Sequence, residues 1–123
     1  MNVSGNITAP NVIANTGYHF RSVNAAVSAA GTVQGNATAI AREVNVVSTV
    51  ASGAGVVLPT AVAGMCVHLI NTAANALLVY PASGGKINAL ATDAAYSIPA
   101  SSNMLQFVAV SATQWYTAGA TYA

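Results

Sequence analysis

Short apolar runs rich in β-branched residues follow one another along most of this chain, and each run ends at glycine, proline, asparagine or serine. Turn-forming residues recur about every 8–12 residues, which is the pattern of an all-β domain. Even the most apolar stretch, residues 50–70, contains Gly53, Gly55, Pro59 and Gly64. A membrane-spanning helix needs about 20 predominantly apolar residues without such breakers. We therefore expect the chain to fold as short strands and turns.

Alternation within the runs predicts where the strands lie and how they pair. We expect strands at residues 44–50, 55–58, 65–70, 77–80, 86–88, 96–98, 104–110 and 114–117. The turn-like sequence NTAAN at 71–75 predicts a hairpin between residues 65–70 and 77–80. Apolar residues occupy both alternating sets of residues 65–70, which indicates a strand covered on both faces. The sequence thus predicts an antiparallel β-sandwich or jelly roll whose outer face meets a neighbouring molecule.

The first 30 residues have a different pattern. Residues 4–10 and 11–17 are two loosely similar units of asparagine, glycine, threonine and branched aliphatics, which are too few for a repeat architecture. We expect an extended N-terminal arm over residues 1–30 for oligomerisation or attachment, and a β-sandwich domain over residues 31–123. Residues 22–30 fit a short helix or a strand equally well. The arm residues that we expect at an interface are Val3, Ile7, Val12, Ile13 and Tyr18.

Charged residues are scarce, and the whole set is Arg21, Arg42, Glu43, Lys86 and Asp93. Soluble domains average about 25% charged residues, whereas this chain has 4% charged and 54% hydrophobic residues. A net charge of +1 from dispersed basic residues excludes the phosphate-binding stripe of a nucleic-acid-binding protein. High hydrophobicity with low charge also excludes disorder. Much of the surface is therefore expected to be covered by another copy, another protein or lipid.

Lipid is the least favoured of these three. The opening MNVSGN has neither the basic region nor the apolar region of a secretory signal. We therefore expect a protein made in the cytoplasm, without membrane association.

No motif in the sequence indicates catalysis, a cofactor or a metal. Glu43 and Asp93 are 50 positions apart, and neither has a histidine at a spacing typical of acid–base catalysis. Cys66 and His68 are two residues apart on one strand and so share a face. A single cysteine and a single histidine among apolar residues usually have a packing role rather than a catalytic one. The two histidines, one cysteine and two acids give no metal-ligand spacing. We expect a protein that is not an enzyme and has a buried Cys66.

Aromatic residues near the C-terminus offer one further candidate site. Trp115 and Tyr116, together with Tyr80, Tyr96 and Tyr122, are of the type that stacks on sugar rings. A single tryptophan near the end of a β-sandwich is more often a core or subunit-interface residue. Trp115 and Tyr116 are therefore added to the expected interface residues.

Several segments together resemble a small β domain found in structural proteins of tailed bacteriophages, cyanophages among them. The resemblance covers about residues 31–118, and its segments are residues 44–50 (VNVVSTV), 55–59 (GVVLP), 63–65 (AGM), 70–88 (INTAANALLVYPASGGKIN) and 109–116 (AVSATQWY). Related domains are found in capsid decoration proteins, head-fibre proteins and tail fibres. The first 30 residues lie outside the resemblance.

The resemblance implies a non-enzymatic virion component without cofactors, and a homotrimer. Its expected partner is the major capsid protein or another virion protein, and its expected place is the outer surface of the capsid. Such a protein can replace surface charge with contact area, as obligate interfaces do. The alternative function is a tail-fibre or receptor-binding tip that recognises host polysaccharide through Tyr and Trp side chains.

Overall fold

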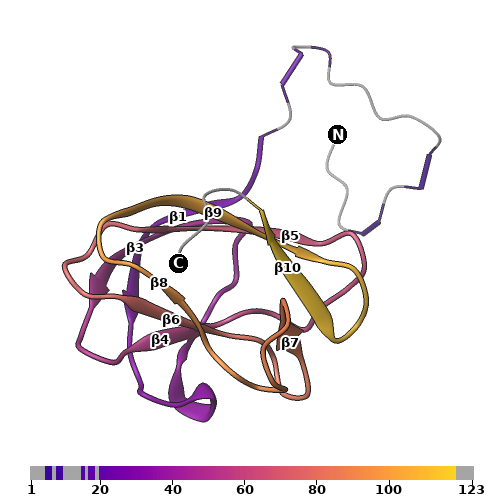
Figure 1. The fold of residues 1–123 in the computed structure, drawn as a ribbon. Helices are drawn as coiled ribbons and strands as arrows, with labels where there is room; N and C mark the ends of the chain where they lie inside the picture. Colours follow the sequence, from indigo (N-terminus) through magenta and orange to yellow (C-terminus); the bar gives the residue numbers. More distant parts are fainter. Residues whose placement is uncertain (1–4, 7, 10–14, 16, 19, 119–123) are drawn as a thin grey trace.

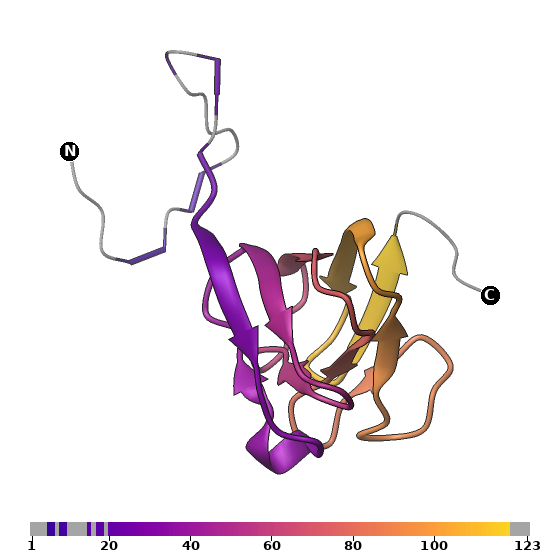
Figure 2. The same ribbon diagram turned by 90° about the vertical axis from the view of Figure 1, so that its left-hand side faces the viewer.

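A computed structural model describes residues 5–6, 8–9, 15, 17–18 and 20–118 of the chain. The described residues form ten strands and one 3-10 helix, η1 (Gln34–Asn36) (Figures 1 and 2). The strands are β1 (Val23–Ala29), β2 (Thr38–Ala39), β3 (Val44–Val50), β4 (Gly55–Val57), β5 (Cys66–Asn71), β6 (Leu77–Tyr80), β7 (Lys86–Ile87), β8 (Tyr96–Ile98), β9 (Ser102–Ala109) and β10 (Gln114–Ala118). Each run expected to be a strand is one, residues 23–29 form the strand β1 that was one of two alternatives there, and the structure adds β2.

The strands form two sheets, and the chain passes from one sheet to the other after almost every strand. The larger sheet has the order β1-β3-β5-β9-β10-β7, and the smaller has the order β2-β4-β6-β8. Only β9 and β10 are consecutive in the chain and neighbours in one sheet. Figure 1 shows β1, β5 and β9 as one layer over β4 and β6. The fold is therefore all-β and sandwich-like, as expected.

Both sheets are mixed, which corrects the expectation of an antiparallel sandwich. Among the described strands, β1–β3, β3–β5, β2–β4, β4–β6 and β10–β7 pair in parallel. Only β5–β9, β9–β10 and β6–β8 are antiparallel. The cause is the winding of the chain. Each of the first strands crosses to the other sheet and then returns beside its predecessor in the same direction, as parallel pairs require.

The expected hairpin between residues 65–70 and 77–80 does not form. β5 pairs with β3 and β9 in the larger sheet, whereas β6 pairs with β4 and β8 in the smaller sheet. Asn71 directs the chain between the sheets: its buried amide donates to the carbonyl oxygens of Asn75 (2.9 Å) and Pro99 (3.0 Å). The turn signal was correct, but the turn joins two layers rather than two paired strands.

The core lies between the two sheets. The larger sheet contributes Phe107, Trp115, Leu69 and Leu105, and the smaller sheet contributes Val56, Leu77, Val79 and Ile98, all almost fully buried. Tyr96 of β8 meets Phe107 of β9 edge to face, with ring centroids 6.0 Å apart. Side chains that alternate with these point to the outer faces of the sheets.

Residues 23–29, which the sequence analysis assigned to the arm, form β1 at one edge of the larger sheet. The helix that was the other interpretation of residues 22–30 is therefore absent from this described segment. Val27 and Ala29 are buried, so β1 is part of the sandwich core. The register with β3 shifts between Asn24 and Val27, which is a bulge.

Candidate functional site

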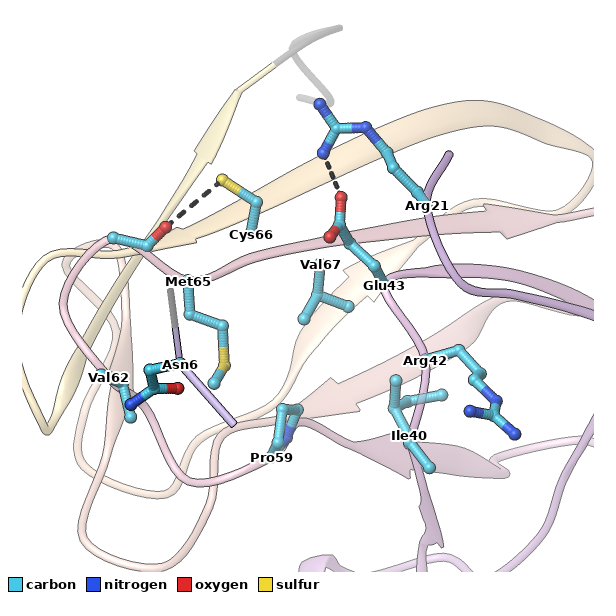
Figure 3. Close-up of a pocket in the computed structure, with 12 residues that line it drawn as sticks. Asn6, Arg21, Ile40, Arg42, Glu43, Pro59, Val62, Met65, Cys66 and Val67 are labelled. Carbon is cyan, nitrogen blue, oxygen red and sulfur yellow. Dashed lines mark hydrogen bonds and ion pairs between the residues drawn. The ribbon is translucent and has the colours of Figure 1, made fainter. Parts of the chain in front are cut away.

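A pocket of about 740 Å³ lies beside the start of β3 and β5 (Figure 3). Its apolar lining comes mostly from the chain before these strands, and consists of Ile40, Ala41, Pro59, Val62, Met65, Cys66 and Val67. The size is within the range of pockets that bind small molecules or inserted side chains, about 300–1,000 Å³.

Three of the five charged side chains of the protein line this pocket: Arg21, Arg42 and Glu43. The Arg21 guanidinium donates to the Glu43 carboxylate, and Figure 3 shows this pair on one side of the pocket with the Arg42 guanidinium away from it. In the part of the chain that the structure describes, Arg42 has no carboxylate partner. The pocket therefore has an apolar floor and a net positive rim, which suits an apolar group next to an anion.

A second candidate surface is the outer face of the six-stranded sheet. Cross-strand partners share a face, so the register places Val23, Val44, His68 and Gln106 in one row across four strands. Cys66, Val108 and Tyr116 form the row on one side of it. Val46 and Ile70 are paired on the other side, where Met104 also points outward because Leu105 points into the core. We call these ten residues the open face.

None of the ten residues of the open face is charged, and Lys86, paired with Gln114 at the β7 edge, lies on the same side of the sheet. Its members are Val23, Val44, Val46, Cys66, His68, Ile70, Met104, Gln106, Val108 and Tyr116. Val23, Met104 and Tyr116 are exposed, and the others are partly exposed. Isolated apolar residues are normal on protein surfaces, whereas a contiguous patch of them marks an interaction site.

The smaller sheet differs, because part of its outer face is covered by the chain itself. Tyr80 alternates with the buried Val79 and is only 9% exposed. Its ring lies close to Gly55, since a Cβ atom on that glycine would be 2.9 Å from Tyr80 Cε2. The Tyr80 hydroxyl donates to the carbonyl oxygen of Thr32 at 3.2 Å, just before η1. The larger sheet, by contrast, presents rows of uncharged outward side chains across β1, β3, β5, β9 and β10.

The residues expected at an interface differ in where the structure places them. Trp115 is 1% exposed in the core, so it is available neither to a partner nor to a sugar ring. Tyr116, its neighbour in β10, is exposed on the open face. Tyr18 is also exposed, and its ring lies 6.4 Å from that of Phe20. Val3, Ile7, Val12 and Ile13 lie outside the described residues.

The two acidic residues considered for catalysis, Glu43 and Asp93, each bond groups of the protein itself. Glu43 pairs with Arg21, and Asp93 Oδ1 accepts hydrogen bonds from Gly84 N (2.7 Å) and Gln34 Nε2 (3.0 Å). Cys66 and His68 share the open face, as expected for alternate residues. Cys66 is partly exposed rather than buried, because its side chain points outward between the inward residues.

Searches restricted to the described segments found neither a metal-binding cluster of His, Cys, Asp and Glu side chains nor a helix long and apolar enough to cross a membrane. Comparison with known proteins gave no matching family model, no matching curated protein and no matching solved structure.

Most of the open face was not named from the sequence. The signal that it left was the apolar occupancy of both alternating sets in residues 65–70, which predicted a strand with a covered outer face. The partners of that strand, β3 and β9, do not directly precede or follow it in the chain. Alternation within each strand therefore could not predict which residues of the three strands lie side by side. The pocket left no sequence signal, since Arg21, Arg42 and Val62 come from separate segments.

Proposed function

We propose that this protein is a non-enzymatic structural component of a bacteriophage virion, a capsid decoration or head-fibre protein that works as a homotrimer. The proposal places it on the outer surface of the capsid, bound to the major capsid protein. The observation that carries it is the combination of five charged side chains with an accessible surface of 7267 Å². Well-behaved soluble monomers have about 25–35% charged residues on their surface.

The exposed apolar side chains support the same proposal. Large hydrophobic residues are exposed at Tyr18, Phe20, Val23, Val33, Val62, Met104, Val110 and Tyr116. A particle component that stays bound to its neighbours hides such residues in permanent interfaces, which resemble a domain core cut in half.

The two candidate surfaces give the proposed protein two kinds of contact. The open face suits packing against an equally uncharged surface. The pocket, with Arg42 at its rim and Val62 and Met65 in its lining, suits an acidic segment with an apolar side chain on a capsid protein. The resemblance of residues 31–118 to phage structural domains adds to this proposal.

The alternative of a glycan-binding tail tip keeps an exposed Tyr116 but not an exposed Trp115. Stacking on a sugar requires an accessible aromatic face, and Trp115 is in the core. No second function is therefore proposed.

Location and copy number on the particle test the proposal. Electron cryomicroscopy of the intact particle should show density for this chain over the capsid shell, and quantitative mass spectrometry should count copies in the hundreds. Density at the tail with only a few copies per particle would contradict a decoration role. A particle preparation without the chain would contradict any structural role in the virion.

A further inference from the structure

We infer that the open face of the six-stranded sheet is the surface through which copies of this chain associate, with the faces turned toward a shared axis. The inference rests on the proposed function in one respect, namely that the protein works as an assembly. It adds which surface is buried and which surfaces stay free for other partners.

The first argument is the composition of the open face. Its central row, Val23, Val44, His68 and Gln106, crosses β1, β3, β5 and β9 without a charge. A sheet face that is solvated normally alternates with polar and charged residues. Charge is depleted at the centre of stable interfaces, where aromatic residues and methionine are enriched, and Tyr116 and Met104 lie at the margin of this row.

The second argument is area. Five strands at about 4.8 Å spacing, with three rows of outward residues about 6.7 Å apart, give roughly 480 Å² of sheet. A standard stable interface buries about 800 Å² per partner. Tyr18 and Phe20 precede β1 directly and are 70% and 89% exposed. Aromatic side chains bury about 150–250 Å² each, so an interface that also takes in these two would reach the standard area.

The third argument identifies the occupant as a second copy. A charged partner surface would have to leave its own ions unpaired against the uncharged rows that cross β1, β3, β5, β9 and β10, which is costly. Another copy of the chain supplies the same uncharged rows, with Lys86 only at the β7 edge of that side. The smaller sheet is not the equivalent surface, because Tyr80 and the segment before η1 lie over it.

Charged substitutions on the open face test the inference in the full chain. The double variant Met104→Lys/Tyr116→Lys changes side chains that are 44% and 51% exposed, so folding should be preserved. An unpaired charge inside an apolar interface should weaken association by about 10²-fold or more. Light scattering after size-exclusion chromatography should give a multiple of 12.2 kDa for the wild type and 12.2 kDa for the variant at the same concentration.

The matched control is Val33→Lys, at a side chain that is 57% exposed beside η1 and away from the open face. This control should keep the wild-type mass. The native Cys66 gives an independent readout without substitution, because its thiol should react with a maleimide at least about tenfold more slowly in the assembly than in the double variant. If the double variant does not fold, fast labelling of Cys66 in the wild-type assembly would still overturn the inference.

The outcomes separate this inference from the proposed function. An assembly that survives Met104→Lys/Tyr116→Lys would overturn the open face as the interface and leave the decoration role standing. Dissociation by Val33→Lys alone would do the same. A wild-type monomer of 12.2 kDa would overturn the inference together with the trimer, while binding to phage heads would remain a separate measurement.

Discussion

Several exposed or partly exposed polar side chains hold the strands and turns together. Asn75 Nδ2 donates to the carbonyl oxygen of Val50 (2.8 Å), and Gln114 Nε2 donates to those of Asn88 (3.0 Å) and Trp115 (2.8 Å). Asn88 in turn exchanges two hydrogen bonds of 3.0 Å with Thr117. These side chains bond backbone groups of neighbouring strands and turns, so their role in the structure is to stabilise the fold.

The clearest single-residue test of this network is Asn71→Asp. Asn71 is fully buried, its amide donates to the carbonyl oxygens of Asn75 and Pro99, and its Oδ1 accepts from Ala73 N at 3.1 Å. A carboxylate loses the donor and faces carbonyl oxygens, so we expect a loss of at least about 3 kcal/mol in the free energy of unfolding. Urea denaturation followed by circular dichroism measures it.

Asn24→Asp is the control for that substitution. Asn24 is exposed, and its Oδ1 only accepts a hydrogen bond from Ala26 N at 3.2 Å, which an aspartate oxygen also does. The free energy of unfolding should stay within about 0.5 kcal/mol of the wild type. Equal effects of the two substitutions would contradict a specific role of the Asn71 amide.

Gly55 gives a second residue-scale prediction, because a side chain there has no space. A Cβ atom would lie 2.7 Å from the carbonyl oxygen of Leu78 and 2.9 Å from the Tyr80 ring. We expect Gly55→Ala to destabilise the fold by about 1–3 kcal/mol, the usual range for overpacking. At Gly35 a Cβ atom would meet nothing within 4 Å, so Gly35→Ala should leave the melting temperature within about 2 °C of the wild type. A Gly55→Ala variant that melts like the wild type would show that β4 and β6 move apart easily.

At the scale of elements, the sequence predicts which residues form strands far better than how strands pair. Residues 77–80 and 96–98 are strands with the expected bounds, because alternation and a following proline or turn act locally. The pairing of β5 with β3 and β9 depends on packing between distant segments, so the turn at 71–75 was interpreted as a hairpin. The sequence left residues 22–30 open between a helix and a strand because VNAAVSA contains three alanines, which disfavour strands, and tertiary packing decides for the strand β1.

The element prediction concerns η1, whose Gln34 amide donates both to the carbonyl oxygen of Pro81 (2.7 Å) and to the carboxylate of Asp93 (3.0 Å). Asp93 Oδ1 accepts from Gln34 Nε2 in η1 and from Gly84 N in the turn before β7, and Asp93 has a left-handed φ of 65°. Asp93→Ala removes both hydrogen bonds and places alanine in that conformation, so we expect about 2–3 kcal/mol of destabilisation. Asp93→Asn keeps an acceptor oxygen and tolerates this φ, and should recover most of the loss.

Hydrogen exchange of the amides measures whether the effect is confined to that region. In Asp93→Ala, exchange of Gly84 and of residues 34–37 should accelerate more than exchange of β5. Uniform acceleration across the chain would show that Asp93 stabilises the whole domain rather than the attachment of η1.

At the scale of the whole molecule, the few charges are placed unevenly. Arg21, Arg42 and Glu43 surround the pocket, Asp93 holds a turn, and Lys86 lies on the short edge strand β7. The rows of the open face across β1, β3, β5, β9 and β10 are therefore uncharged, and Lys86 lies on the same side of the sheet only at its β7 edge. A charged edge with only two residues discourages pairing at β7, so the apolar face is the side of the domain best suited to association.

This charge distribution predicts how association responds to salt. Raising the ionic strength from 0.01 M to 1 M shortens the Debye length from about 30 Å to about 3 Å, which weakens assemblies held by ion pairs. Copies that meet through the open face bury mainly apolar surface, so their dissociation constant should stay constant or fall, and sulfate should lower it further. Sedimentation velocity across a salt series measures this.

The single variant Met104→Lys places like charges near one another in the assembly and should associate better as salt rises, because salt screens their repulsion. Dissociation of the wild type at 1 M salt would mean that the Arg21, Arg42 and Glu43 cluster, rather than the open face, holds the copies together.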